Sequence, residues 1–359
     1  MKPIKVGVAG LGMVAQIMHL RYLKELEDFE IAAVCDISKS LCDYIGDAFG
    51  VSGRYTDAAE MIEKEDLDAI FILTFYHSEI AIAAARKGIH VFCEKPVAFS
   101  VKECDEMIKA KNRAGTVFMI GYMKRFDEAF LQGMKIFSEM KKSRDLRMIH
   151  VHDACFANEL ALKTMHSIVS FDDVAPGMRR VMSRLMEKRI DEALGGAPKF
   201  VRNAYRMLLE TGSHDITVLR GAFGDPKKII NTEIWPKGNW FVSTLDYGGD
   251  VRCVFDVART ARGWGDEHIT AYGMTRTASV VFPIPFNQNE PTIVRVTDME
   301  GDATVAREIV PSYAESFRNE LLHFADCIRK KKTPLTSLEE GRLDTILMQN
   351  MIKKFKTRA

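Results

Sequence analysis

Short apolar runs alternate with amphipathic segments through the first third of the chain. The predicted strands fall at residues 4–9, 31–35, 54–55, 67–73, 89–92 and 117–121. Runs that are apolar on both faces are typical of a parallel sheet covered by helices on both sides. The alternation predicts a doubly wound parallel sheet over residues 1–122.

The pattern changes after residue 122. Further strands are predicted at residues 146–156, 228–235, 240–247, 250–257, 268–273, 277–282, 292–296 and 304–310. No helix of crossover length is predicted between the strands after residue 228, so this second sheet should be mainly antiparallel. We therefore predict an α/β fold with two domains, residues 1–122 and 123–359.

Two helical regions complete the second domain. Residues 158–206 are rich in Met, Arg and Lys and predict a helical insertion, and two helices, at about 314–331 and 338–356, finish the chain. An apolar stripe at helical spacing in the insertion favours a core or subunit contact, and a lid is the alternative.

A glycine-rich turn follows the first predicted strand. Gly10 permits a tight turn, Gly12 lets the backbone approach a pyrophosphate, and Ala15 keeps the next helix close to the strand. The first helical turn, with Met13 and Val14, offers free N–H groups to phosphates. This pattern predicts a dinucleotide site; the alternative is a tight turn that binds nothing.

Polar residues follow the other predicted strands, where ligands of such sheets bind. Asp36 can accept hydrogen bonds from the adenosine ribose, and its charge disfavours a 2′-phosphate, which favours NAD over NADP. Thr74 and His77 lie in the loop after the fourth strand, and His77 either lines the nicotinamide or packs internally. Glu94 and Lys95 end the next strand, where the ammonium group can donate to a substrate oxygen or move a proton.

Composition removes several classes of function. The formal net charge is +1, which gives no broad surface for nucleic acid. The seven cysteines form no CxxC pair, which suits reduced thiols better than a disulfide framework or a zinc site. The first residues lead directly into a strand and no apolar run reaches the length of a membrane span, so we expect a cytoplasmic protein without membrane contact.

Several motifs together resemble the Gfo/Idh/MocA family of oxidoreductases. They are the glycine turn, Glu94-Lys95-Pro96, residues 121–126, 210–214 and 317–324. The resemblance implies a Rossmann domain that binds NAD or NADP, and a second domain for substrate binding and oligomerisation. It also implies oxidation or reduction of one carbon of a sugar, cyclitol or polyol, without a metal. The family's usual catalytic lysine falls on Lys95.

The resemblance also suggests residues of the second domain. Glu210 and His214 are four apart and should share a helix face. His214 would move a proton, and Glu210 would orient it or bind a substrate hydroxyl, although the family often has Asp at this position. Arg125 either contacts substrate or forms a hinge salt bridge. Trp264 either stacks on a sugar ring or anchors a loop.

We therefore expect an NAD(P)-dependent oxidoreductase that acts on CH–OH groups, with Lys95 and His214 as proton-transfer groups. One alternative is an enzyme with a retained NAD that oxidises a sugar transiently and then eliminates or hydrolyses a group. A second alternative is a non-catalytic sensor of a dinucleotide or sugar. Family habit and the open sheet favour a homo-oligomer, a dimer or a tetramer.

Overall fold

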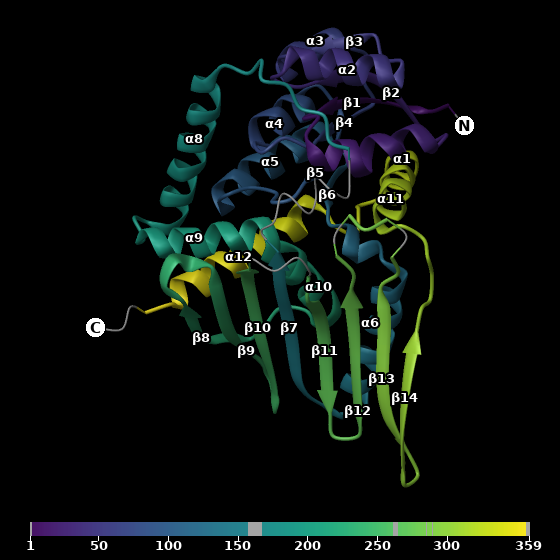
Figure 1. Cartoon of the computed structure of the whole chain (residues 1–359), viewed down its shortest axis with the longest axis vertical. Coiled ribbons are helices and arrows are strands. Elements are labelled where there is room, and N and C mark those ends of the chain that lie inside the picture. The colour runs from purple at the N-terminus through teal and green to yellow at the C-terminus, as the bar shows by residue number, and fades with distance from the viewer. Residues whose placement is uncertain (1, 157–166, 261–264, 285, 289, 357–359) are drawn as a thin grey trace. The chain divides into compact units, whose positions relative to one another are not determined.

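The computed structural model describes residues 2–156, 167–260, 265–284, 286–288 and 290–356. The chain divides into two compact units. The first comprises Met1–Tyr122, Leu162–Arg189 and Phe317–Thr345, and the second comprises Met123–Ala161, Ile190–Ser316 and Ile346–Ala359. The first unit thus includes residues 162–189 and 317–345 as well as residues 1–122, and the domain bounds expected from the sequence, 1–122 and 123–359, stay a prediction. Figure 1 follows the chain through its elements.

A six-stranded parallel sheet forms the centre of the first unit, as predicted. Its strands are β1 (Ile4–Ala9), β2 (Phe29–Cys35), β3 (Gly53–Tyr55), β4 (Ala69–Ile72), β5 (His90–Glu94) and β6 (Phe118–Gly121). Their order is β3-β2-β1-β4-β5-β6, so the winding direction reverses between β1 and β4. All four residues of β4 are buried, because helices cover both sheet faces. Ligands of such sheets bind beyond the carboxyl ends of the strands at this reversal.

The helices of this unit connect the strands or are added from later parts of the chain. The connecting helical elements are η1 (Ala15–His19), α1 (Leu20–Glu25), α2 (Lys39–Phe49), α3 (Ala58–Lys64), α4 (Ser78–Arg86) and α5 (Val101–Ala114). The carboxyl-terminal helix α11 (Ser316–Lys330) packs Phe324 against Phe71 of β4 and Phe92 of β5, with ring centroids 5.7 and 5.6 Å apart. This contact explains why α11 belongs to the first unit.

Helix α8 (Pro176–Leu194) begins in the first unit and ends in the second. Its residue Arg189 donates to Glu103 of α5 at 2.8 Å, and Tyr76 donates to the carbonyl oxygen of Met182. Within the predicted apolar stripe, Met186 and Ile190 are buried, but Val181 is 59% exposed. The stripe is therefore a packing face over only part of its length.

The second unit contains an eight-stranded sheet. Its strands are β7 (Leu146–Phe156), β8 (Lys228–Ile234), β9 (Trp240–Gly248), β10 (Val251–Thr260), β11 (Glu267–Gly273), β12 (Arg276–Phe282), β13 (Ile293–Glu300) and β14 (Ala303–Ile309). The order is β14-β13-β12-β11-β7-β10-β9-β8. Among the pairings of the described strands of this second sheet, only β7–β10 is parallel, which confirms a mainly antiparallel sheet.

Helices cover one face of this sheet. The remaining helical elements are η2 (Met123–Phe126), α6 (Glu128–Lys142), α9 (Lys199–Met207), η3 (Leu208–Gly212), α10 (Ser213–Phe223), η4 (Pro236–Gly238) and α12 (Leu338–Lys354). Helix α6 contacts β12 and β13, and α10 contacts β7. Ile149 and Val151 of β7 are accordingly fully buried. None of the helices in the described ranges has the length and apolar character needed to span a bilayer.

Candidate cofactor and active site

The glycine turn has the backbone that its sequence predicts. Gly10 has φ +95°, and a Cβ there would lie 2.7 Å from backbone atoms of Leu73 and Thr74. A side chain at this position would therefore push β1 away from β4. Around Gly12, a Cβ would meet nothing within 4 Å, so the backbone borders open space. A cradle of this kind lets a phosphate approach the main chain.

The helix that follows is wider than predicted. Met13 and Val14 are helical and half-buried, but η1 (Ala15–His19) is a π-helical turn rather than a regular α-helix. Gln16 donates to the carbonyl oxygens of Leu11 and Val169, at 2.8 and 2.9 Å, and accepts from the Val169 N–H at 3.0 Å. The glycine turn is thus tied to the segment before α8.

Asp36 lies at the end of β2, as predicted for a ribose-binding acid. Its carboxylate accepts from the backbone N–H groups of Leu11, at 2.8 Å, and Ser38, at 3.0 Å. Each oxygen keeps a second lone pair that a ribose hydroxyl can use. Asp173 lies close by, because its carboxylate accepts from the Ser38 hydroxyl at 2.6 Å and the Ser40 N–H at 2.8 Å. Two carboxylates therefore flank the start of α2.

A cavity of about 630 Å³ opens at this edge of the parallel sheet. Its lining includes Gly10, Gly12, Asp36 and Thr74 from the strand ends, together with Phe75, Tyr76, Met178 and Met182. It lies at the carboxyl ends of strands, where the winding direction reverses. The open cradle at Gly12, the helix N-terminus and Asp36 fit the pyrophosphate and ribose of a dinucleotide.

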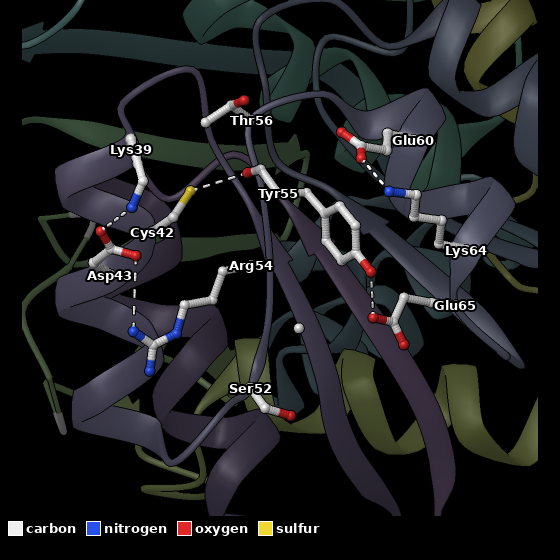
Figure 2. A pocket seen from close by; sticks show the side chains of 11 residues that line it. Lys39, Cys42, Asp43, Ser52, Arg54, Tyr55, Thr56, Glu60, Lys64 and Glu65 are labelled. Atoms are coloured by element: carbon white, nitrogen blue, oxygen red, sulfur yellow. Dashed lines mark hydrogen bonds and ion pairs between the residues drawn. The ribbon is translucent and has the colours of Figure 1, made fainter.

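A second hollow, of about 530 Å³, lies between α2, β3 and α3 (Figure 2). It contains three cationic side chains, and each is paired with an acid of the same hollow. Lys39 contacts Asp43 at 2.5 Å, Lys64 contacts Glu60 at 2.6 Å, and Arg54 contacts Asp43 at 3.7 Å. These charges are neutralised locally, so the hollow has no excess of positive charge for an additional phosphate.

Lys95 follows β5 and is half-buried. The preceding Glu94 is buried, and its carboxylate contacts His19 Nε2 at 2.7 Å and accepts from the Lys95 N–H at 3.0 Å. Burial alone would raise the pKa of Glu94, but the hydrogen bond from His19 and the charges of His19 and Lys95 lower it overall. The buried Glu94 carboxylate therefore fixes the backbone of Lys95 through this hydrogen bond. The sequence had indicated Glu94 but not His19.

His77 and Thr74 have different positions. Thr74 lines the cavity, and its hydroxyl donates to the Tyr76 carbonyl oxygen at 2.6 Å. The His77 ring is buried between the carbonyl oxygens of Pro96, at 2.8 Å, and Thr74, at 2.5 Å, and burial lowers its pKa. His77 thus links the loop after β4 to the loop after β5. Of the two roles that the sequence left open for His77, these contacts favour internal packing over lining the nicotinamide.

In the second unit, Glu210 and His214 fall on either side of a change in helix type. Glu210 is in the π-helical turn η3, and His214 is half-buried in the first turn of α10. The Glu210 carboxylate accepts from Arg259 of β10 at 2.6 Å. The sequence did not indicate Arg259, because nothing in its local pattern marks a partner from a distant strand.

Arg125 is buried against α10. It donates to the carbonyl and hydroxyl oxygens of Thr217, at 3.1 and 3.4 Å, and so supports the helix that carries His214. The adjacent Lys124 forms a buried ion pair with Glu267, and its ammonium lies 4.7 Å from the centroid of the Phe282 ring. Trp264 lies outside the described residues.

Three buried acids form a group that includes Asp215, the residue directly after His214. Asp215, Asp153 and Glu267 are each buried, with carboxylate oxygens within 4.8 Å of one another. Burial, and then the charge of Asp153, raises the pKa of Asp215 well above its ordinary value, and the two carboxyl groups are hydrogen-bonded. Protonation of Asp215 is therefore favoured in the folded protein relative to an exposed aspartate. Asp153 and Glu267 were not predicted as site residues.

The parallel sheet, the glycine cradle and the acid at the end of β2 define a dinucleotide-binding Rossmann domain. Residues 4–122 match the family model described as an oxidoreductase family with an NAD-binding Rossmann fold. Residues 4–122 are therefore similar to the Gfo/Idh/MocA oxidoreductases, and the resemblance predicted from the motifs is confirmed over this domain.

Two relatives and one solved structure illustrate the similarity. Myo-inositol 2-dehydrogenase of Thermotoga maritima is 25% identical over 96% of this chain and 94% of its own length. The 2,7-anhydro-N-acetylneuraminate hydratase of Mediterraneibacter gnavus is 31% identical over 39% of this chain and 37% of its own length. The aldose-aldose oxidoreductase of Caulobacter crescentus, crystallised with glycerol, is 19% identical and covers 98% of this chain and 97% of its own, with a TM-score of 0.74. This last similarity concerns the fold.

Proposed function

We propose that the protein is an NAD-dependent oxidoreductase that transfers a hydride between the nicotinamide and a CH–OH carbon of a sugar, cyclitol or related polyol. The observation that carries the proposal is the cavity that joins Gly10, Gly12 and Asp36, in the same unit as the ordered Lys95 loop. The dehydrogenase name of the relative that matches almost the whole chain supports a polyol substrate.

The carboxylates at the start of α2 support NAD over NADP. A 2′-phosphate beside the ribose would approach Asp36 and Asp173, and like charges repel at this range. Lys39 and Arg54, the nearby cations, both contact Asp43. NADP would therefore bind without the cationic partner that its extra phosphate needs.

In the proposed mechanism, bound NAD supplies the hydride acceptor, and the chain supplies position and proton transfer. Lys95 takes the proton of the substrate hydroxyl during oxidation and returns it during reduction. His19 and Glu94 hold the backbone of Lys95 in place. His214 is the second proton-transfer group, and Glu210, oriented by Arg259, accepts a hydrogen bond from a substrate hydroxyl.

The assignment of Arg125 changes within this proposal. Sequence alone left a substrate contact and a hinge salt bridge open for Arg125. Its hydrogen bonds to Thr217 support a different role, in which Arg125 positions α10.

We keep a homo-oligomer, either dimer or tetramer, and a cytoplasmic location as predictions. The sheet face opposite α6 and α10 is the surface on which a second copy would pack.

A second candidate is an enzyme whose NAD is retained through transient oxidation, with elimination or hydrolysis in between. The relative named as a hydratase favours this possibility, although it matches only part of the chain. The two candidates share the first hydride transfer and differ in whether reduced cofactor leaves the protein.

A substrate screen tests the proposal. Purified protein is mixed with a panel of sugars, cyclitols and polyols and with NAD or NADP, and the reduced-nicotinamide absorbance is followed. We expect turnover with at least one polyol and a preference for NAD. Product without accumulation of reduced cofactor would select the second candidate. Ligand binding without turnover across the panel would overturn both and favour a sensor.

A further inference from the structure

A row of polar residues crosses the centre of the eight-stranded sheet. Strand β7 lies between β11 and β10, and the register places His152 directly beside His268 of β11 and Asp256 of β10. His150 lies two residues away on the same face of β7. Four side chains that commonly bind metals therefore converge from three adjacent strands (Figure 1 shows the strands).

The contacts within this cluster are short. His150 Nε2 lies 2.7 Å from Asp256 Oδ1, and His152 Nδ1 lies 2.6 Å from Asp256 Oδ2. The ring of His268 has its centroid 5.2 Å from that of His150 and 5.4 Å from that of His152. The donor atoms of His150, His152 and Asp256 all lie within 4.8 Å of one another.

This geometry requires little movement to accept a metal ion. With bonds of about 2.1 Å at tetrahedral angles, neighbouring donor atoms on zinc are about 3.4 Å apart. Each histidine nitrogen and the Asp256 oxygen that it contacts would separate by less than about 1 Å as the ion replaces the shared proton, and the other donor pairs, which lie within 4.8 Å, would adjust to the same spacing. The side chains of His150, His152 and Asp256 are 28%, 19% and 16% exposed, so an ion can reach them from solution before a second copy packs on this sheet face.

Surrounding groups orient the rings as they do in protein metal sites. The hydroxyl of Thr270 lies 3.0 Å from His268 Nδ1, which leaves Nε2 as the ring nitrogen that can face a metal. Asp266 Oδ2 lies 3.6 Å from His152 Nε2, on the opposite side of the ring from Asp256. Such outer contacts fix the tautomer and orientation of metal-binding histidines.

We propose that His150, His152 and Asp256 bind one Zn²⁺ ion per chain, and that the neighbouring ring of His268 turns towards the ion as a fourth ligand. Three imidazoles and one carboxylate are ligands that suit zinc and related late transition metals, whereas Mg²⁺ prefers oxygen ligands alone. The ion would cross-link β10, β7 and β11, including the one parallel pair of the sheet.

The site is separate from the residues proposed for the reaction. Alternation along β7 places Asp153, which contacts Asp215 of α10, on the buried face, and His150 and His152 on the other. The zinc site is therefore structural and does not rest on the proposed oxidoreductase activity.

Metal binding is tested on the full chain without a histidine tag, after dialysis against EDTA. Isothermal titration with Zn²⁺ should give one submicromolar site, and Mg²⁺ should give none. The variant Asp256→Asn should weaken Zn²⁺ binding about 100-fold or more, because it removes an anionic ligand. Asp246→Asn is the matched control, since Asp246 is also in this sheet but contacts Arg252 instead.

A second measurement does not depend on any variant. Co²⁺ bound to the wild-type protein should show the visible absorption of a tetrahedral nitrogen–oxygen site, and stoichiometric Zn²⁺ should abolish it. The proposal is overturned if the wild type binds no Zn²⁺, if the cobalt spectrum is that of the hydrated ion, or if Asp256→Asn binds as tightly as Asp246→Asn. Circular dichroism verifies that both variants are folded.

Discussion

Glu320 of α11 is a fully buried carboxyl group in the first unit. Neither of its carboxyl oxygens has a hydrogen-bond partner among the described residues. Burial, and then the charge of Glu94, raises the pKa of Glu320 well above the ordinary value of 4.5. The folded protein therefore keeps a proton that the unfolded chain releases, and folding becomes less favourable as the pH rises above the unfolded value.

The size of this effect follows from the linkage between pH and folding. Over the pH range in which the folded state keeps the proton, each pH unit above 4.5 lowers the free energy of unfolding by about 1.4 kcal/mol. Between pH 5.5 and 7.5, two units, this linkage sets an upper limit of about 2.7 kcal/mol on the change. The substitution Glu320→Gln removes the titrating group, so its stability relative to the wild type should rise over this interval, by no more than that limit.

Urea unfolding, followed by circular dichroism at both pH values, measures the difference. Any pH-independent effect of the substitution cancels when the two differences between variant and wild type are subtracted. Glu63→Gln is the control, because Glu63 has an exposed side chain that contacts Lys87 at 3.5 Å, and it should show almost no pH-dependent difference. A Glu320→Gln variant with no gain between pH 5.5 and 7.5, or with a loss, would refute the assignment of a buried neutral carboxyl.

Three further predictions concern the cofactor and substrate sites. Asp36→Ser should raise the ratio of NADP-dependent to NAD-dependent kcat/KM, because it removes a negative charge near the 2′-position of the ribose. Adding Asp173→Asn should raise this ratio further for the same reason. An unchanged ratio would exclude both residues from cofactor selection. Gly10→Ala should weaken NAD binding in fluorescence titration and destabilise the fold by about 1–3 kcal/mol, because φ is +95° and Cβ would contact backbone. Arg259→Ala should raise KM more than it lowers kcat, because it frees Glu210 from its orienting contact. The free energy of unfolding should change by about 1 kcal/mol or less. An effect on kcat alone would contradict a substrate-binding role for Glu210.

The strand pattern was predictable because burial imposes it directly. The predicted strands at 4–9 and 146–156 match β1 and β7, and the other predicted strands differ from the observed ones by up to a few residues at one or both ends. Apolar runs and the lack of crossover helices determine whether neighbouring strands are parallel, so both sheets followed from the sequence. The parallel pairing of β7 and β10 did not, because these strands are far apart in the chain.

Local helix type and buried polar partners were not predictable in this way. The π-helical turns η1 and η3 each widen the helix by a fraction of a residue per turn, which apolar periodicity does not detect. Both occur beside candidate site residues, Gly12 and His214. His19, Asp153 and Arg259 contact residues that lie distant in sequence, so their roles depended on the three-dimensional structure.

The assignment of residues 162–189 to the first unit has a similar cause. An apolar stripe shows that a helix is packed on one side, but not which surface it contacts. Contacts such as Arg189 with Glu103 and Gln16 with Val169 decide the grouping, and they use polar groups that have no sequence pattern.

The role of Lys95 is tested by the effect of Lys95→Met on turnover and on NAD binding, measured separately with the best substrate from the screen. Lys102→Met, at an exposed position on α5, is the matched control. Lys95→Met should keep the wild-type affinity for NAD and lose at least about 100-fold in kcat, because the proton-transfer group is gone. Turnover close to that of Lys102→Met would contradict the central claim that Lys95 is the acid–base group.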